Sequence, residues 1–188
     1  MINIYMEKIL WYTTITESDK FIIEWVDINF GNWNQWTFHK IKFKDFKNEN
    51  SNRIWVMICA IDEELNIYMI EQFQVVTESR MFLLPRWWAK NWDYLKSAQE
   101  ELSEEIWYMA DKLEELTTIY VSPWYFQQWT KLYLATGLQK SKMEWDELEE
   151  IALHKINIYD AIKMIMRWEI TDARTISWIF FVKEYLWL

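Results

Sequence analysis

The sequence predicts an α/β fold in which a central mixed sheet carries helices on both of its faces. Two apolar runs, residues 54–61 and 66–76, have the length and composition of buried strands. The segment around Leu102 repeats apolar residues at helical spacing, and residues 158–167 and 172–186 are expected to close the chain as two helices. Helices on both sides of such a sheet would bury the apolar surfaces of both kinds of element.

The chain begins with β-rich sequence that is expected to lie outside the main domain. Apolar and polar residues alternate before a turn at 31–34, which leads into a second strand that ends near Phe43. The polar, asparagine-rich stretch 44–53 then predicts a loop. We therefore expect a β-hairpin extension over residues 1–45 and a larger domain over residues 46–188.

The larger domain continues the mixed pattern toward its closing helices. Further strands are expected near residues 116–121, 129–135 and 151–156. A chain of 188 residues is long enough to bury one substantial core.

Global properties narrow the class of protein. The formal net charge is −9 and no stretch is rich in lysine or arginine, so nucleic acid is not an expected partner. No apolar run reaches 18 residues, and the first 15 residues lack the charged-then-apolar order of a signal peptide. We therefore expect no membrane partner and a cytoplasmic location. The single cysteine, Cys59, lies in an apolar run, which predicts a buried, reduced thiol.

Carboxylates gather on the predicted helix. Glu101, Glu104 and Glu105 are spaced i, i+3 and i+4, so they share one face over about two turns, and Glu100 lies nearby. Like charges at this spacing repel each other, and a hard divalent cation such as Mg²⁺ would remove the repulsion. The alternative is an ordinary solvated acidic face, which is commoner for such a pattern. The apolar stripe beside these carboxylates is expected to consist of Leu95, Ala98 and Leu102.

The composition departs from average usage in two residue types. The chain has 2 glycines, where roughly 7 % usage would give about 13, and it has 15 tryptophans. Tryptophan also stands where turns favour glycine, at Trp33, Trp107, Trp145 and Trp168. We hypothesise that the gene encodes glycine by UGA at such positions and that UGA was translated here as tryptophan. A naturally tryptophan-rich protein is the alternative.

The stretch 84–108 resembles the Nudix hydrolase box. That box runs glycine, five residues, Glu, seven residues, and then Arg-Glu-aliphatic-x-Glu-Glu-x-Gly-aliphatic. Residues 101–108, Glu-Leu-Ser-Glu-Glu-Ile-Trp-Tyr, match its second half, with Trp107 in place of the glycine. Residues 84–88, Leu-Pro-Arg-Trp-Trp, are similar to the Leu-Pro-x-Gly that opens the box in ADP-ribose pyrophosphatases.

The box also departs from the family pattern. Glu100 occupies the position of the box arginine, and one residue is missing between the two halves, so Asp93 replaces the first box Glu only approximately. The three positions at which the family binds metal are intact.

The resemblance to ADP-ribose pyrophosphatases extends over about residues 20–186. Residues 68–73 are similar to the strand before the box, although Glu71 and Gln74 replace two arginines of the family. Pro123 belongs to a Ser-Pro-Trp similar to the family's Ser-Pro-Gly, and it lies 15 residues after Tyr108, a spacing associated with ADP-ribose. Three shorter segments are also similar to parts of the family's enzymes. Residues 132–135 resemble a core strand, residues 146–151 resemble an acidic loop that supplies a catalytic Glu, and residues 170–175 resemble the last helix.

The resemblance implies a Nudix α/β/α sandwich and a Mg²⁺-dependent hydrolase, with Mn²⁺ as an alternative ion. Without the resemblance, the acidic run 146–150 would be interpreted as a solvated turn. Arg86 has two interpretations, a contact to a substrate phosphate or an exposed loop residue. The implied residues are Glu101, Glu104 and Glu105 for the metal; Glu147 as general base, supported by Glu149, with Glu104 as the next candidate; and Arg86 and Pro123 for the substrate.

Three functions agree with these features. The first is hydrolysis of ADP-ribose, or of a similar nucleoside diphosphate derivative, into AMP and a sugar phosphate. The second keeps the fold but acts on another ADP-containing or sugar nucleotide. The third is a catalytically impaired Nudix-fold binding protein, suggested by Glu100, the shortened box and Trp88. Two N-terminal hairpins that pair across a two-fold axis would form a homodimer, as the family's dimers suggest.

Overall fold

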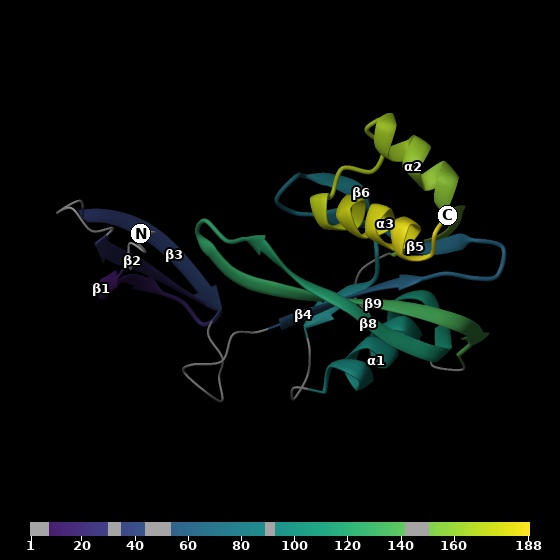
Figure 1. Cartoon of the computed structure of the whole chain (residues 1–188), viewed down its shortest axis with the longest axis horizontal. Helices are drawn as coiled ribbons and strands as arrows, with labels where there is room; N and C mark the ends of the chain where they lie inside the picture. The colour runs from purple at the N-terminus through teal and green to yellow at the C-terminus, as the bar shows by residue number, and fades with distance from the viewer. Residues whose placement is uncertain (1–7, 30–34, 44–53, 89–92, 142–150) are drawn as a thin grey trace, which may run out of the picture. The chain divides into compact units, whose positions relative to one another are not determined.

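The structure is a computed structural model, and it describes residues 8–29, 35–43, 54–88, 93–141 and 151–188 (Figure 1). The chain divides into two compact units: Met1–Ile54 with Tyr120–Trp129, and Trp55–Ile119 with Thr130–Leu188. The predicted turn at 31–34 and the predicted loop at 44–53 lie outside the described residues.

The first unit contains three antiparallel strands, β1 (Lys8–Glu17), β2 (Phe21–Asn29) and β3 (Gln35–Phe43). The predicted hairpin is confirmed, because β2 and β3 pair in one continuous register from Phe21 with Phe43 to Asn29 with Gln35. The prediction had no strand at β1, although its β-branched and aromatic residues favour one. β3 also pairs in parallel with the first residues of β9, at Ile41 with Phe126.

The second unit holds strands from two sheets. In one sheet β9 pairs with β4, β4 pairs with β7, and β8 pairs with β9; in the other the order is β10-β5-β6. β8 and β9 are longer than the predicted strands and contribute residues to both units. The short strands β6 and β7 were not predicted. The bounds are β4 (Ile54–Ala60), β5 (Asn66–Gln74), β6 (Ser79–Leu83), β7 (Arg86–Trp88), β8 (Tyr108–Ser122), β9 (Phe126–Lys140) and β10 (Ala152–Asn157).

Three helices complete the second unit, α1 (Tyr94–Ile106), α2 (Ile158–Met166) and α3 (Ala173–Tyr185). The bounds of α2 and α3 agree closely with the predicted ones, and α1 lies in the segment that was expected to be helical. None of the helices in the described part of the chain is long and apolar enough to cross a membrane.

β4 and the first half of β5 are buried on both faces. Side chains alternate along β4, so Met57 and Cys59 enter one hydrophobic cluster while Val56 and Ile58 enter another. The first cluster includes α2 and α3 and the second includes α1, and the figure shows these helices on opposite sides of β4 (Figure 1). Two covered faces explain why these strands are continuous apolar runs. The predicted α/β/α arrangement around a mixed sheet is confirmed.

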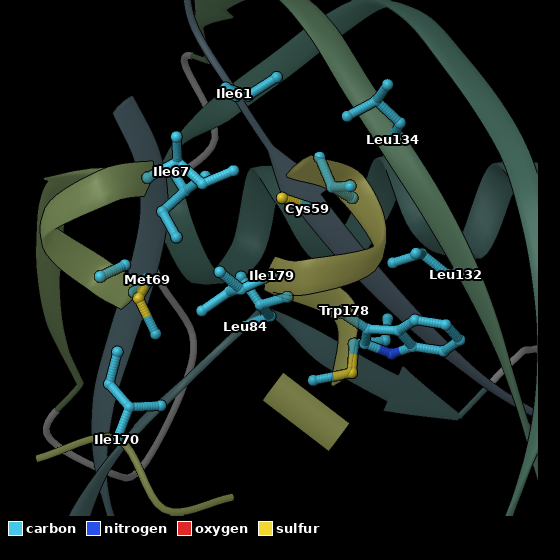
Figure 2. Close-up of a cluster of buried hydrophobic side chains, with 14 residues drawn as sticks. Cys59, Ile61, Ile67, Met69, Leu84, Leu132, Leu134, Ile170, Trp178 and Ile179 are labelled. Atoms are coloured by element: carbon cyan, nitrogen blue, oxygen red, sulfur yellow. The ribbon is translucent and has the colours of Figure 1, made fainter. Parts of the chain in front are cut away.

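Figure 2 shows the cluster that α3 covers. Trp178 is its largest buried side chain and is only 1 % exposed, yet its indole N–H has no hydrogen-bond acceptor within the described part of the chain. Cys59 lies in the same cluster, as predicted, and burial raises the pKa of its thiol to about 12.

Each helix is followed by a tryptophan with positive φ: 61° at Trp107, 65° at Trp168 and 57° at Trp187. At Trp168 and Trp187 the backbone hydrogen bonds are those of a Schellman motif, in which glycine is the usual residue. The only other non-glycine residues with positive φ in the described segments are Leu65 and Glu78. The predicted turn contexts of Trp107 and Trp168 are therefore confirmed, while those of Trp33 and Trp145 lie outside the described residues.

Candidate functional site

α1 presents its carboxylates from a well-defined helix. The helix begins after Asp93, whose carboxylate accepts a hydrogen bond from the Lys96 backbone N–H at 3.0 Å. Asp93 therefore acts as the N-cap. The predicted apolar stripe was wrong at Leu95, which is exposed because the buried face runs one turn further along the helix. The apolar residues of that face are Ala98, Leu102 and Ile106.

Two of the predicted metal ligands are buried. Glu101 is 2 % exposed and Glu105 is 3 % exposed, while Glu104 is half-buried. Glu100 lies nearer the surface, where it faces Lys96 at 3.8 Å. The solvated acidic face is therefore the wrong interpretation for Glu101 and Glu105, because burying a carboxylate is costly unless polar or cationic partners compensate it.

Glu105 is held by the first residue of β7. Its Oε2 accepts a hydrogen bond from the backbone N–H of Arg86 at 3.2 Å. The Arg86 side chain is 13 % exposed, so the interpretation of Arg86 as an exposed loop residue is wrong. Its guanidinium donates to Asp172 Oδ1 and to Gln74 Oε1, both at 3.3 Å.

Asp172 is the N-cap of α3 and had no assigned role in the prediction. Its Oδ2 accepts hydrogen bonds from the backbone N–H and the hydroxyl of Thr175, both at 2.9 Å. Its Oδ1 faces Arg174 at 3.3 Å as well as Arg86. The sequence signal was present, since an aspartate at the start of a predicted helix is a strong N-cap candidate.

The ionisable side chains around Asp172 and Arg86 shift each other's pKa. Burial would raise the pKa of Asp172, but the guanidinium groups of Arg174 and Arg86 and the hydrogen bonds from Thr175 outweigh it and lower that pKa. Burial and the charge of Arg174 lower the pKa of Arg86, although Asp172 and Glu105 oppose this shift. The lowered pKa keeps the Asp172 carboxyl ionised at neutral pH.

The two positions that replace family arginines have partners of their own. Gln74 accepts from Arg86, as described above. Glu71 faces the Arg80 guanidinium at 3.4 Å and His154 Nε2 at 3.0 Å, across β6 and β10 respectively. Glu71 therefore places a negative group, paired with basic neighbours, where the family has a positive one.

Comparison with known proteins places this geometry in a family. No protein-family model matches the chain. The chain is 30 % identical over 123 residues to an ADP-ribose pyrophosphatase of Bacillus subtilis, covering 64 % of this chain and 66 % of that protein. It is 30 % identical over 124 residues to the methanol dehydrogenase activator of Bacillus methanolicus, covering 64 % of this chain and 67 % of that protein. It therefore spans about two thirds of the length of these two relatives.

A longer match is the ADP compounds hydrolase NudE of Escherichia coli, 25 % identical over 179 residues, which cover 95 % of this chain and 92 % of that protein. A crystal structure of an ADP compounds hydrolase superposes with a TM-score of 0.83 at 25 % identity, covering 96 % of this chain and 94 % of that one. The chain belongs to the Nudix hydrolase family. Its α1 is thus the helix of the Nudix box.

The donor set of this Nudix box suits a hard divalent cation. Two carboxylates buried four residues apart on one helix repel each other, and carboxylate oxygens are the ligands that Mg²⁺ prefers. Within the described segments, however, no three Asp, Glu, His or Cys side chains are gathered closely enough to hold a metal ion in their present positions. The fit therefore rests on the chemistry and burial of Glu101 and Glu105.

The remaining predicted site residues lie elsewhere. Glu147 and Glu149 are outside the described residues. Pro123 belongs to the first unit, where it lines a largely apolar cavity of about 350 Å³ together with Phe38 and Trp124. Arg86, Glu101, Glu104 and Glu105 all belong to the second unit.

Proposed function

We propose that this Nudix hydrolase cleaves the pyrophosphate bond of ADP-ribose, or of a related ADP-containing derivative, into AMP and a sugar phosphate with the help of Mg²⁺. The observation that carries the proposal is the burial of Glu101 and Glu105 on the box helix, with Glu105 held by the Arg86 backbone N–H. The names of two relatives and of the similar structure, an ADP-ribose pyrophosphatase and two ADP compounds hydrolases, support the substrate class.

The carboxylates of the box helix would hold the metal. Glu101, Glu104 and Glu105 project from consecutive turns, so the helix itself sets their spacing. Once bound, Mg²⁺ or Mn²⁺ neutralises charge that develops on the phosphate oxygens and lowers the pKa of a bound water. The Arg86 N–H restricts the Glu105 carboxylate to one position, which reduces the reorganisation needed for binding.

The other steps need a base and substrate contacts. We assign Glu147 as the general base that accepts the proton of the attacking water, with Glu149 in support and Glu104 as the alternative base. Arg86 is assigned to a substrate phosphate, because its guanidinium is a fixed, permanently charged donor at the box loop. Pro123 is assigned to the substrate because its Ser-Pro-Trp is similar to the family's Ser-Pro-Gly and it follows Tyr108 by 15 residues.

The proposal is tested by measuring AMP release from ADP-ribose with and without Mg²⁺. We expect Mg²⁺-dependent release that falls by about 100-fold or more in Glu105→Gln, because a small displacement of catalytic groups costs about that much. Glu100→Gln is the matched control: it makes the same change five residues earlier on α1, at a residue that faces Lys96 and is assigned no metal role. Equal activity of the Glu105 and Glu100 variants would reject the assignment.

The same assay separates the alternatives. Turnover of another ADP-containing or sugar nucleotide, with none of ADP-ribose, would favour the second enzyme function. Metal binding without turnover of any nucleotide would favour a Nudix-fold binding protein.

We also propose that residues 1–45 form an extension to a catalytic domain of residues 46–188, and that two extensions pair in a homodimer in the cytoplasm. The exposed side chains of Trp11 and Trp25, which the strand register places on one face of β1 and β2, support an interface there. A molar mass of one chain by light scattering, unchanged up to high concentration, would reject the dimer.

We further propose that the gene encodes glycine by UGA where this chain has tryptophan at turns and in the box. The positive φ angles of Trp107, Trp168 and Trp187 support this proposal. The coding DNA decides it: UGA codons at 87, 88, 92 and 107 are expected, and UGG codons there would end the hypothesis.

A further inference from the structure

We infer that Asp172 is a positioning residue of the active site, which acts through Arg86 to hold the Glu105 carboxylate in place. The inference rests on the proposed function for the role of Glu105. Its basis is a continuous chain of contacts from the first turn of α3 to the box helix α1.

The first link joins α3 to the loop that opens the box. Asp172 Oδ1 accepts from Arg86 Nη1 at 3.3 Å, and Thr175 Oγ1 accepts from the Leu84 backbone N–H at 3.3 Å. Thr175 and Asp172, which lie in the same turn at the start of α3, therefore attach the two ends of the segment 84–86 to this helix. The Pro85 between them stiffens the segment.

The second link joins that loop to the box helix. The backbone N–H of the same residue, Arg86, donates to Glu105 Oε2 at 3.2 Å. The Arg86 backbone is also paired with Met57 of β4, so the guanidinium contacts act together with this strand pairing to position the donor that holds Glu105. Gln74 Oε1 accepts a hydrogen bond from the other guanidinium nitrogen, Arg86 Nη2, at 3.3 Å, but the Gln74 side chain is uncharged.

Asp172 is the charged anchor of this arrangement. Its Oδ2 is occupied by the N–H and hydroxyl of Thr175, which directs Oδ1 toward the guanidinium groups of Arg86 and Arg174. The side chains of Arg86 and Asp172 are each 13 % exposed, so little solvent screens them. Without the carboxylate charge the two guanidinium groups would repel each other in a poorly hydrated place, and Arg86 would shift toward water.

The test uses Asp172→Asn, Arg86→Gln and the double variant of the full chain. Asparagine keeps a side-chain oxygen that caps α3 but removes the charge, and Arg86→Gln keeps the backbone N–H while it removes the guanidinium. Asp160→Asn is the matched control, because it makes the same substitution in the first turn of α2, at an exposed residue paired only with Lys163 among the described side chains.

Two measurements are made: binding of Mn²⁺ by electron paramagnetic resonance, and kcat and KM for ADP-ribose. We expect Asp172→Asn and Arg86→Gln each to weaken Mn²⁺ binding by about 10- to 100-fold, as loss of a group that orients a metal ligand does. We expect kcat to fall as well, and the double variant to be no worse than the poorer single one, because both changes break the same chain of contacts.

Several outcomes would overturn the inference. Wild-type Mn²⁺ affinity in Asp172→Asn or in Arg86→Gln would do so, and so would effects of the two substitutions that multiply in the double variant. If Asp172→Asn does not fold, Asp172→Ser, which also caps a helix and also lacks the charge, replaces it in both measurements. Wild-type protein that binds Mn²⁺ but turns over no nucleotide would reject the proposed function, while a loss of Mn²⁺ binding in Asp172→Asn would still support the inference.

Discussion

Replacing Trp168 by glycine should stabilise this protein. Trp168 follows α2 with a φ of 65°, and its N–H donates to the Ile165 carbonyl at 3.1 Å, while the Glu169 N–H donates to the Met164 carbonyl at 2.9 Å. This hydrogen-bond pattern is a Schellman motif, whose central residue is usually glycine because a Cβ is strained in the left-handed conformation. The indole is 84 % exposed, so it contributes little packing.

The expected gain is the relief of strain minus the entropy that glycine adds to the unfolded chain. A residue with a Cβ costs about 1–2 kcal/mol in the left-handed region. Glycine offsets roughly 0.5–1 kcal/mol of this gain because it increases the conformational entropy of the unfolded chain. The net gain in the free energy of unfolding is about 1 kcal/mol, which raises Tm by about 2–4 °C in a domain of this size.

The assay is thermal denaturation of four proteins followed by circular dichroism. Trp168→Ala removes the indole but keeps the Cβ, so its Tm should stay near that of the unsubstituted chain. Trp178→Gly should lower stability by about 4 kcal/mol, because it empties a fully buried site inside α3. A Tm of Trp168→Gly that does not exceed that of Trp168→Ala would refute the reasoning.

Three further predictions follow from single residues. Gly137→Ala should lower the free energy of unfolding by about 2 kcal/mol in urea titrations, because Gly137 has a φ of 66° and a new Cβ would lie 2.8 Å from Asp111 Cβ; unchanged stability would contradict the geometry. Cys59 should resist iodoacetamide at pH 8 in the folded protein and react fully in urea, since burial raises its pKa to about 12; mass spectrometry of labelled protein distinguishes the two. The native pKa of Asp172 lies below its ordinary 3.8, so its carboxylate stabilises the fold fully at neutral pH and loses that contribution as the pH falls below about 4. The stability difference between the wild type and Asp172→Asn should therefore shrink in that acidic range, and a constant difference would contradict the assigned ion pairs.

Much of the architecture was predictable because its signals are local. Alternating and continuous apolar runs predicted β2 to β5, helical spacing of apolar residues placed a helix in the segment of α1, and α2 and α3 were predicted to within a few residues. The short strands β6 and β7 were missed, because five- and three-residue segments owe their conformation to pairing with β5 and β4. Leu95 was misassigned because it lies in the first turn of α1, before the part of the helix that is buried, and periodicity alone does not show where along a helix burial begins.

For the site, the sequence by itself determined the carboxylates: the spacing of Glu101, Glu104 and Glu105 follows from the helix on which they lie. Only the tertiary structure decided which of them are buried, since burial depends on elements distant in the chain. The tertiary structure also decided which residues hydrogen-bond to Arg86. These partners, Glu105, Gln74 and Asp172, lie 19, 12 and 86 residues away along the chain. Sequence separations of this size leave no periodic signal, because contact across them is made by the packing of whole helices and strands.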